Sequence, residues 1–170
     1  MHFGRLEKND IANGPGVRVS IWVSGCTLKC PGCFNIKSHD FNYGEEFTQD
    51  TIDEVLESLK PDYIKGLTIL GGEPLMIQNQ ESVMNLILSA REVYGLSKDI
   101  ILFSGFTMDN IKSESQKNKN SILNCILRNC DFMVTGPYLM HEQVLDQFRG
   151  SANQEYWMND KGDWKLINKL

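Results

Sequence analysis

Hydrophobic and polar positions along the chain follow two alternating patterns, short apolar runs and longer amphipathic segments. Four runs of apolar and β-branched residues are short enough to predict buried strands. These runs lie at 17–24, 66–70, 99–104 and 132–135. Two of the segments between them repeat apolar residues at i, i+3, i+4 and i+7, which predicts helices over 48–60 and 79–94. Predicted strands therefore alternate with predicted helices.

The remaining segments have weaker patterns. Residues 5–16 are polar and end in an Asn-Gly-Pro-Gly turn. Residues 107–128 have a helical pattern that the polar stretch 112–120 interrupts. Near the carboxyl end, apolar residues at 155–158 and 164–167 flank a polar turn, so this tail is predicted as a hairpin.

The order of these elements predicts an α/β fold with parallel strands joined by right-handed crossovers. A closed barrel of eight strands takes about 250 residues, and this chain has only 170. We therefore expect an open, partial βα barrel or a wound sheet. One domain is expected over 1–154, with a short extension over 155–170. In either fold, ligands bind at the carboxyl ends of the parallel strands.

Composition narrows the possible functions. The net charge of −5 argues against a protein that holds nucleic acid by bulk charge. No apolar run is long enough to predict a membrane span, and the first residues lack the apolar core of a secretory signal. We therefore expect a cytoplasmic protein, in which five cysteines are more typical of metal or catalytic ligands than of disulfides.

Three of these cysteines lie close together in the sequence Cys-Thr-Leu-Lys-Cys-Pro-Gly-Cys. They are Cys26, Cys30 and Cys33. Iron–sulfur clusters are held by cysteine thiolates, and a four-iron cube normally takes four of them. Three local thiolates would leave one iron open to bind a small molecule. The alternative is a structural zinc site, whose fourth ligand would be His39, Cys125 or Cys130.

A second group of candidate residues follows the strand predicted at 66–70. Its sequence is Gly71-Gly72-Glu73-Pro74, and two glycines at a strand end allow the backbone to approach a ligand closely. Taken alone, this sequence is more typical of an ordinary turn. Because this turn, the cysteine loop and Ser104-Gly105 all follow predicted parallel strands, we expect them to meet at one edge of the sheet.

The cysteine loop after the first apolar run, combined with Gly-Gly-Glu-Pro after the second, resembles the radical S-adenosylmethionine superfamily. Further segments make the chain similar to activating enzymes of glycyl radical enzymes and, among these, to the small activases of anaerobic (class III) ribonucleotide reductases. These segments are 13–18, 23–26, 30–33, 103–106 and 148–154. The resemblance therefore covers most of the chain.

This resemblance implies two cofactors, a 4Fe-4S cluster and S-adenosylmethionine. Cys26, Cys30 and Cys33 would be the catalytic residues and cluster ligands, and the open fourth iron would bind the amino and carboxylate groups of S-adenosylmethionine. Cleavage of S-adenosylmethionine would produce a 5′-deoxyadenosyl radical. The protein would supply binding, orientation and electrostatics for this chemistry.

The resemblance also predicts which residues bind S-adenosylmethionine. The Gly-Gly-Glu sequence would hold the methionine amino group. Gly32, just before the third cysteine, has no side chain to pack on the adenine, so Phe34 or the backbone takes that role. The complete predicted cofactor-binding set is Gly71, Gly72, Glu73, Pro74, Phe34 and Ser104.

The implied partner is the large subunit of an anaerobic ribonucleotide reductase, from which the radical would take a hydrogen atom at a glycine. A low-potential electron donor such as flavodoxin is a second expected partner, whereas nucleic acid and membranes are not. Three alternatives remain: an activase of another glycyl radical enzyme, such as pyruvate formate-lyase, a small iron–sulfur electron carrier, and a zinc-stapled binding module. Cys125 and Cys130 are expected to be buried structural thiols.

Overall fold

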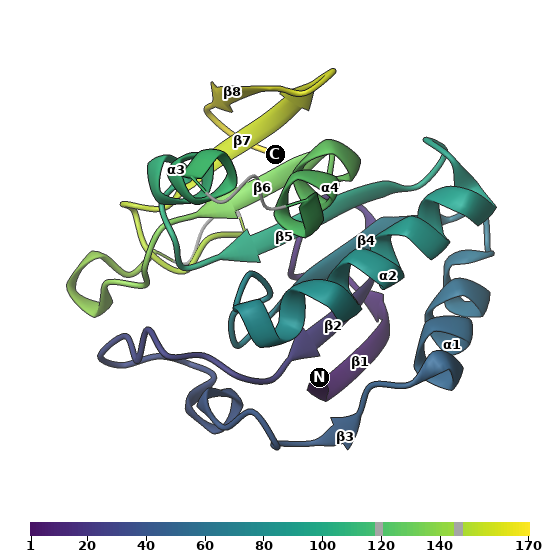
Figure 1. Cartoon of the computed structure of the whole chain (residues 1–170), viewed down its shortest axis with the longest axis horizontal. Coiled ribbons are helices and arrows are strands. Elements are labelled where there is room, and N and C mark those ends of the chain that lie inside the picture. The colour runs from purple at the N-terminus through teal and green to yellow at the C-terminus, as the bar shows by residue number, and fades with distance from the viewer. Residues whose placement is uncertain (118–120, 145–147) are drawn as a thin grey trace.

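A single mixed β-sheet crosses the molecule, with helices packed on one of its faces (Figure 1). In this computed structural model, which describes residues 1–117, 121–144 and 148–170, the sheet has eight strands in the order β3-β1-β2-β4-β5-β6-β7-β8. The strands are β1 (His2–Asp10), β2 (Val17–Val23), β3 (Glu45–Glu46), β4 (Ile64–Gly71), β5 (Asp99–Ser104), β6 (Phe132–Thr135), β7 (Glu155–Asp160) and β8 (Asp163–Ile167).

Parallel strands occupy the centre of the sheet and antiparallel strands its margins. The pairs β2–β4, β4–β5 and β5–β6 are parallel, and β1–β2, β6–β7 and β7–β8 are antiparallel. The strand order ends at β3 on one side and β8 on the other, so no barrel closes among the described strands. The prediction of an open α/β fold with parallel strands is confirmed at this level. The predicted hairpin is also present, as β7 and β8.

The helices follow the predicted amphipathic segments. They are α1 (Gln49–Leu59), α2 (Ile77–Tyr94), α3 (Met108–Lys117) and α4 (Ser121–Asn129), with short 3₁₀ turns at Ile36–His39 and Met140–Glu142. Thr48 is the N-cap of α1, and its backbone N–H donates to the hydroxyl of Thr51 at 3.2 Å. None of the described helices has the length and apolar character that crossing a bilayer requires.

The hydrophobic core lies between the helices and one face of the sheet. Val19, Ile21 and Val23 alternate along β2 and belong to the same buried cluster as Val55 of α1 and Leu86 of α2. Because side chains of a strand point alternately to its two faces, the intervening residues of β2 lie on the opposite face. This second face is the one on which the functional residues gather.

Two sequence expectations differ from the structure. For residues 5–16 the sequence predicts only a turn at their end and no strand, but β1 extends to Asp10 and pairs with β2, because backbone hydrogen bonds to a central strand hold a polar sequence in place. The polar stretch 112–120 was expected to interrupt the helix, but α3 continues through it to Lys117. The rest of that stretch, 118–120, lies outside the described residues.

An ion pair is buried at the beginning of the parallel strands. The side chain of Arg18 on β2 is 0% exposed, and its Nη2 lies 2.5 Å from Oδ1 of Asp99 at the start of β5. Its Nε donates to the hydroxyl of Thr68 on β4 at 2.7 Å, and its Nη2 donates to the carbonyl of Leu67 at 2.9 Å. Arg18 therefore joins three neighbouring strands through hydrogen bonds that leave little of its guanidinium unpaired.

Replacing this arginine tests how much the fold depends on it. We expect Arg18→Met to lower the free energy of unfolding by about 3 kcal/mol or more, because it leaves Asp99 largely buried without its close cationic partner. The measurement is urea denaturation of the apoprotein, with Lys60→Met as the control. Lys60 pairs with Glu57 on the surface, where an ion pair contributes about 0–1 kcal/mol. Equal effects of the two substitutions would show that the buried Arg18–Asp99 pair stabilises the fold no more than a surface ion pair does.

Candidate functional site

A cavity of about 400 Å³ lies at the carboxyl ends of the parallel strands. Residues at the ends of β4, β5 and β6 line one wall, and the loop that follows β2 lines another. Its volume is within the range of about 300–1,000 Å³ that is typical of small-molecule sites. The cavity is therefore large enough for a cofactor, at the edge of the sheet where the sequence predicts one.

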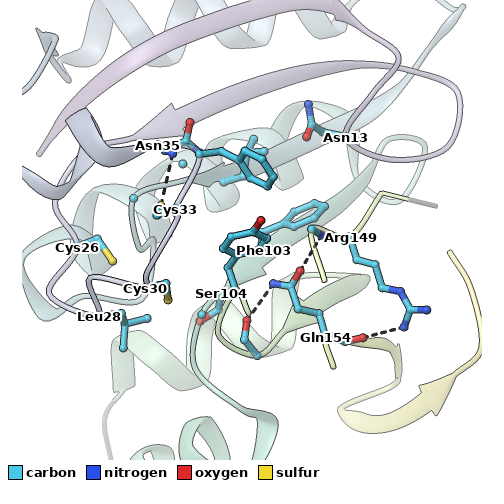
Figure 2. Close-up of a pocket in the computed structure, with 18 of the residues that line it drawn as sticks. Asn13, Cys26, Leu28, Cys30, Cys33, Asn35, Phe103, Ser104, Arg149 and Gln154 are labelled. Atoms are coloured by element: carbon cyan, nitrogen blue, oxygen red, sulfur yellow. Dashed lines mark hydrogen bonds between the residues drawn. The ribbon is translucent and has the colours of Figure 1, made fainter. Parts of the chain in front are cut away.

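The three clustered cysteines all line this cavity. Figure 2 shows Cys26, Cys30 and Cys33 gathered on one side, with Arg149 and Gln154 on the other. Cys26 is 8% exposed, and burial raises the pKa of its thiol. A cation or cluster would therefore be needed to hold Cys26 as a thiolate.

Backbone hydrogen bonds fold the cysteine loop over the cavity. The N–H of Gly25 donates to the carbonyl of Ser38 at 2.8 Å, and the N–H of Cys33 donates to the carbonyl of Cys30 at 3.1 Å. The sulfur of Cys33 accepts a hydrogen bond from the N–H of Asn35 at 3.4 Å. These bonds orient the thiols toward one space although the loop contains little regular secondary structure.

The arrangement of the thiols bears on which metal group fits. Within the described residues, no three His, Cys, Asp or Glu side chains converge on a point where they could hold one metal ion. A structural zinc ion needs four ligands around a single centre, so this part of the chain offers no zinc site. An iron–sulfur cube differs because each thiolate binds a different iron, and separated thiols on one cavity wall fit that requirement.

The two glycines after β4 bring the wall of the cavity against the cysteine loop. Gly71 and Gly72 both line the cavity, and the N–H of Gly72 donates to the carbonyl of Val23 at 2.7 Å. A Cβ on Gly72 would lie 2.8 Å from the carbonyl oxygen of Ser38 and 2.9 Å from that of Gly25. Only glycine therefore permits this approach, and the close packing leaves backbone rather than side chains facing the cavity.

Glu73 lies behind the cavity lining and is fully buried. One carboxylate oxygen accepts hydrogen bonds from the N–H of Leu75 and the hydroxyl of Ser104, both at 2.9 Å. The other accepts from the N–H of Gly105 at 2.7 Å. Burial raises the pKa of Glu73 to about 7, although these three donors oppose the shift. Glu73 thus ties the end of β4 to the end of β5.

The other predicted cofactor-binding residues have different surroundings. Ser104 lines the cavity and is 4% exposed, whereas Pro74 is buried and, like Glu73, is not part of the lining. Phe34 lines the cavity but is 67% exposed, with its ring centre 4.8 Å from that of Tyr138. The structure therefore places seven of the nine predicted residues on one cavity: Cys26, Cys30, Cys33, Phe34, Gly71, Gly72 and Ser104.

Two further residues lie at this site: Tyr138, which sequence patterns did not indicate, and His39, which the sequence offered only as a possible zinc ligand. Tyr138 reaches the cavity from the loop after β6, and its aromatic contact with Phe34 joins that loop to the cysteine loop. His39 also lines the cavity, and its Nε2 is buried without a hydrogen-bond partner among the described residues. A polar atom left unpaired in a cavity wall is available to a bound group. Neither residue belongs to a sequence motif.

The segment 148–154 closes the side of the cavity opposite the cysteines. The side-chain oxygen of Gln154 accepts from the N–H of Gly150 at 2.8 Å, and its amide donates to the carbonyl of Gly136 at 2.9 Å. Arg149 donates to the carbonyl of Ala152 at 3.1 Å (Figure 2 shows its side chain beside Gln154). Most of these polar groups therefore brace the segment itself against the end of β6.

The remaining two cysteines lie away from the cavity. Cys130 is buried at the end of α4, where burial raises the pKa of its thiol, and Cys125 is half-buried on the same helix. Neither lines the cavity. Their positions match the expectation of structural thiols better than that of a second cluster.

Comparison with known proteins agrees with the donor set of this cavity. The model of a family described as "4Fe-4S single cluster domain" matches residues 12–157. A protein of Enterobacteria phage T4 named anaerobic ribonucleoside-triphosphate reductase-activating protein is 35% identical over 97% of this chain and 99% of its own length. Proteins of the same name from Vibrio cholerae and Escherichia coli K12 are 31% and 35% identical, each over 91% of this chain and 96% of their own length. The chain therefore belongs to the family of the anaerobic ribonucleoside-triphosphate reductase-activating proteins.

Proposed function

We propose that this chain is a radical S-adenosylmethionine enzyme that activates an anaerobic ribonucleoside-triphosphate reductase. The observation that carries the proposal is the meeting of three thiols and a glycine-lined wall on one cavity of about 400 Å³. A relative named for reductase activation is 35% identical over 97% of this chain, which supports the same function. The open sheet would then be the partial βα barrel of this superfamily, formed by 1–154, with 155–170 as an extension.

Cys26, Cys30 and Cys33 hold the 4Fe-4S cluster in this proposal, leaving one iron open to S-adenosylmethionine. Three cysteines that form no disulfide and line one wall of the cavity support this choice. When bound, these cofactors supply a 5′-deoxyadenosyl radical that takes a hydrogen atom from a glycine of the large reductase subunit. Low-potential electrons would come from a donor such as flavodoxin, in the cytoplasm.

The glycine-lined cavity wall beside the cysteine loop would bind S-adenosylmethionine. Backbone groups of Gly71 and Gly72 face the cavity and are the groups available to its methionine end. Glu73 and Pro74 support that wall from behind, because both are buried and Glu73 bonds to the neighbouring strand end. Ser104 lines the same wall, where its hydroxyl is held by Glu73.

Phe34 and the open mouth of the cavity suit a substrate that is another protein. Phe34 packs against Tyr138 but remains 67% exposed, so its free ring face can cover an adenine within the cavity. A reactive carbon radical must be kept from water and from other groups until its target is in place. We infer that the glycine-bearing segment of the reductase completes the enclosure.

Substitution of one cysteine tests the cluster assignment. We expect Cys30→Ala to lose most of its iron after anaerobic reconstitution, because two thiolates remain for a cluster that needs at least three. The change in the electron paramagnetic resonance spectrum on adding S-adenosylmethionine should be more than roughly 10-fold smaller than in the wild type. Loss of a group that only supports a ligand already costs roughly 10-fold, and Cys30→Ala removes a ligand itself. Iron and sulfide per chain and the spectra with and without S-adenosylmethionine are the measurements.

Cys125→Ala is the matched control for this experiment. It removes the same group from a half-buried position outside the cavity, so it should retain wild-type iron and a wild-type response to S-adenosylmethionine. If both variants kept equal amounts of cluster, Cys30 would not be a ligand. If the wild-type signal were indifferent to S-adenosylmethionine, the radical mechanism would be excluded.

The raised pKa of Glu73 predicts how stability depends on pH. The pKa of Glu73 is 4.5 in the unfolded chain and about 7 in the folded one, so the folded protein binds the proton more tightly. The protonated side chain therefore stabilises the fold at low pH, and this stabilisation is lost as the pH rises to 7. Relative to Glu73→Gln, the wild-type apoprotein should therefore lose about 3 kcal/mol of unfolding free energy between pH 4.5 and 8. Denaturant unfolding of both proteins at several pH values measures this difference.

The comparison with glutamine isolates Glu73 from other titrating groups. Because all other residues are shared, a difference between the two proteins that stays constant with pH would show that Glu73 has no raised pKa. A difference that changed in the opposite direction would mean that the hydrogen bonds from Leu75, Ser104 and Gly105 outweigh burial.

A further inference from the structure

Asn79 lies beneath the cavity, in the first turn of α2, and is 1% exposed. No sequence motif marks it, and it does not line the cavity. Its own backbone N–H donates to the carbonyl of Met76 at 2.8 Å, so its position is set by the start of the helix. The side chain points away from the helix toward the ends of the strands, where its amide is the donor.

The amide nitrogen of Asn79 is shared among three backbone carbonyls. It lies 2.9 Å from the oxygen of Ser24, 3.0 Å from that of Glu73 and 3.4 Å from that of Gly25. Ser24 and Gly25 directly precede the first cysteine. Glu73 directly follows the two glycines of the turn at 71–74, which we call the glycine turn. One side chain therefore bonds both to the base of the cysteine loop and to the base of the glycine turn.

The cysteine loop and the glycine turn form the two halves of the proposed site. The cysteine loop holds the thiols, and the glycine turn presents the backbone wall beside them. Two backbone hydrogen bonds already join them, from Gly72 N–H to Val23 at 2.7 Å and from Glu73 N–H to Gly25 at 3.0 Å.

Loss of Asn79 would leave the halves connected. This is because the carbonyls of Gly25 and Glu73 still accept from the N–H groups of Glu73 and Met76. The buried carbonyl of Ser24 would lose its side-chain donor, and the base of the cysteine loop would shift relative to the glycine turn to pair it.

We propose that Asn79 is a positioning residue that sets the spacing between the cluster loop and the S-adenosylmethionine wall. This inference rests on the proposed function, because S-adenosylmethionine is the ligand that must reach both halves at once. A cluster needs ligands from the cysteine loop only. S-adenosylmethionine would contact both the cysteine loop and the glycine turn, so its binding depends on the distance between them. Removal of Asn79 should therefore weaken S-adenosylmethionine binding while leaving the cluster in place.

The test compares Asn79→Ala with Gln80→Ala in the reconstituted protein. Gln80 is the adjacent helix residue, is 7% exposed, and donates to the carbonyl of Leu75 at 2.8 Å. Its substitution therefore also removes a buried amide that bonds to a backbone carbonyl, in this case that of Leu75, just before α2. Iron and sulfide content, the spectrum of the reduced cluster, and titration of that spectrum with S-adenosylmethionine are measured for each.

Asn79→Ala should keep wild-type iron content and a wild-type spectrum without S-adenosylmethionine, and its dissociation constant for S-adenosylmethionine should rise roughly 10-fold. Gln80→Ala should bind S-adenosylmethionine as the wild type does. Asn79→Ser, which retains one short donor, should lie between Asn79→Ala and the wild type. A merely structural residue would lower the iron content and the protein's stability without changing affinity in the protein that remains loaded.

Three results would overturn the inference. Asn79→Ala could bind S-adenosylmethionine as tightly as the wild type, or Gln80→Ala could lose the same affinity. Both Asn79 variants could also lose the cluster while Gln80→Ala retains it, which would assign Asn79 to the cysteine loop alone. A wild-type spectrum that ignores S-adenosylmethionine is a separate result, because it refutes the proposed function before any variant is compared.

Discussion

The candidate site depends on how closely the carboxyl ends of β2, β4 and β5 are held together. Side chains cannot fill this junction, because a Cβ at Gly72 would collide with backbone oxygens on either side. The backbones meet directly, and Glu73 then bonds across to Gly105 at the end of β5 at 2.7 Å. Without this junction, the cysteine loop and the glycine-lined wall beside it would not share one cavity.

The two ends of the parallel strands are stabilised by different chemistry. At the amino-terminal end, the fully buried Arg18 forms an ion pair with Asp99. At the carboxyl-terminal end, Glu73 has no cationic partner among the interactions that shift its pKa, and burial makes its proton easier to retain near neutral pH. A negative charge beside a cluster of thiolates would be unfavourable, so a carboxyl that can stay protonated suits this position.

The sequence predicts the parallel strands and the hairpin because their apolar residues are contiguous and the turns between them are marked by glycine or polar residues. It does not predict β1, whose polar residues are held by pairing with β2 rather than by their own propensity. The spacing of the cysteines marks them as metal ligands, whereas the glycine turn becomes a candidate only in combination with them. The role of Glu73 behind the wall, the contact of Phe34 with Tyr138 and the bonds of Asn79 depend on tertiary contacts between distant segments, which no local pattern records.

The most direct test of the central claim is whether this chain generates a radical on its partner. The reconstituted protein, reduced anaerobically, would be mixed with S-adenosylmethionine and the large subunit of an anaerobic ribonucleotide reductase, and the electron paramagnetic resonance spectrum recorded. A glycyl radical signal that requires S-adenosylmethionine and disappears with Cys30→Ala is the predicted result. A loaded cluster that produces no such signal on the reductase, or produces it only on pyruvate formate-lyase, would contradict the proposed function.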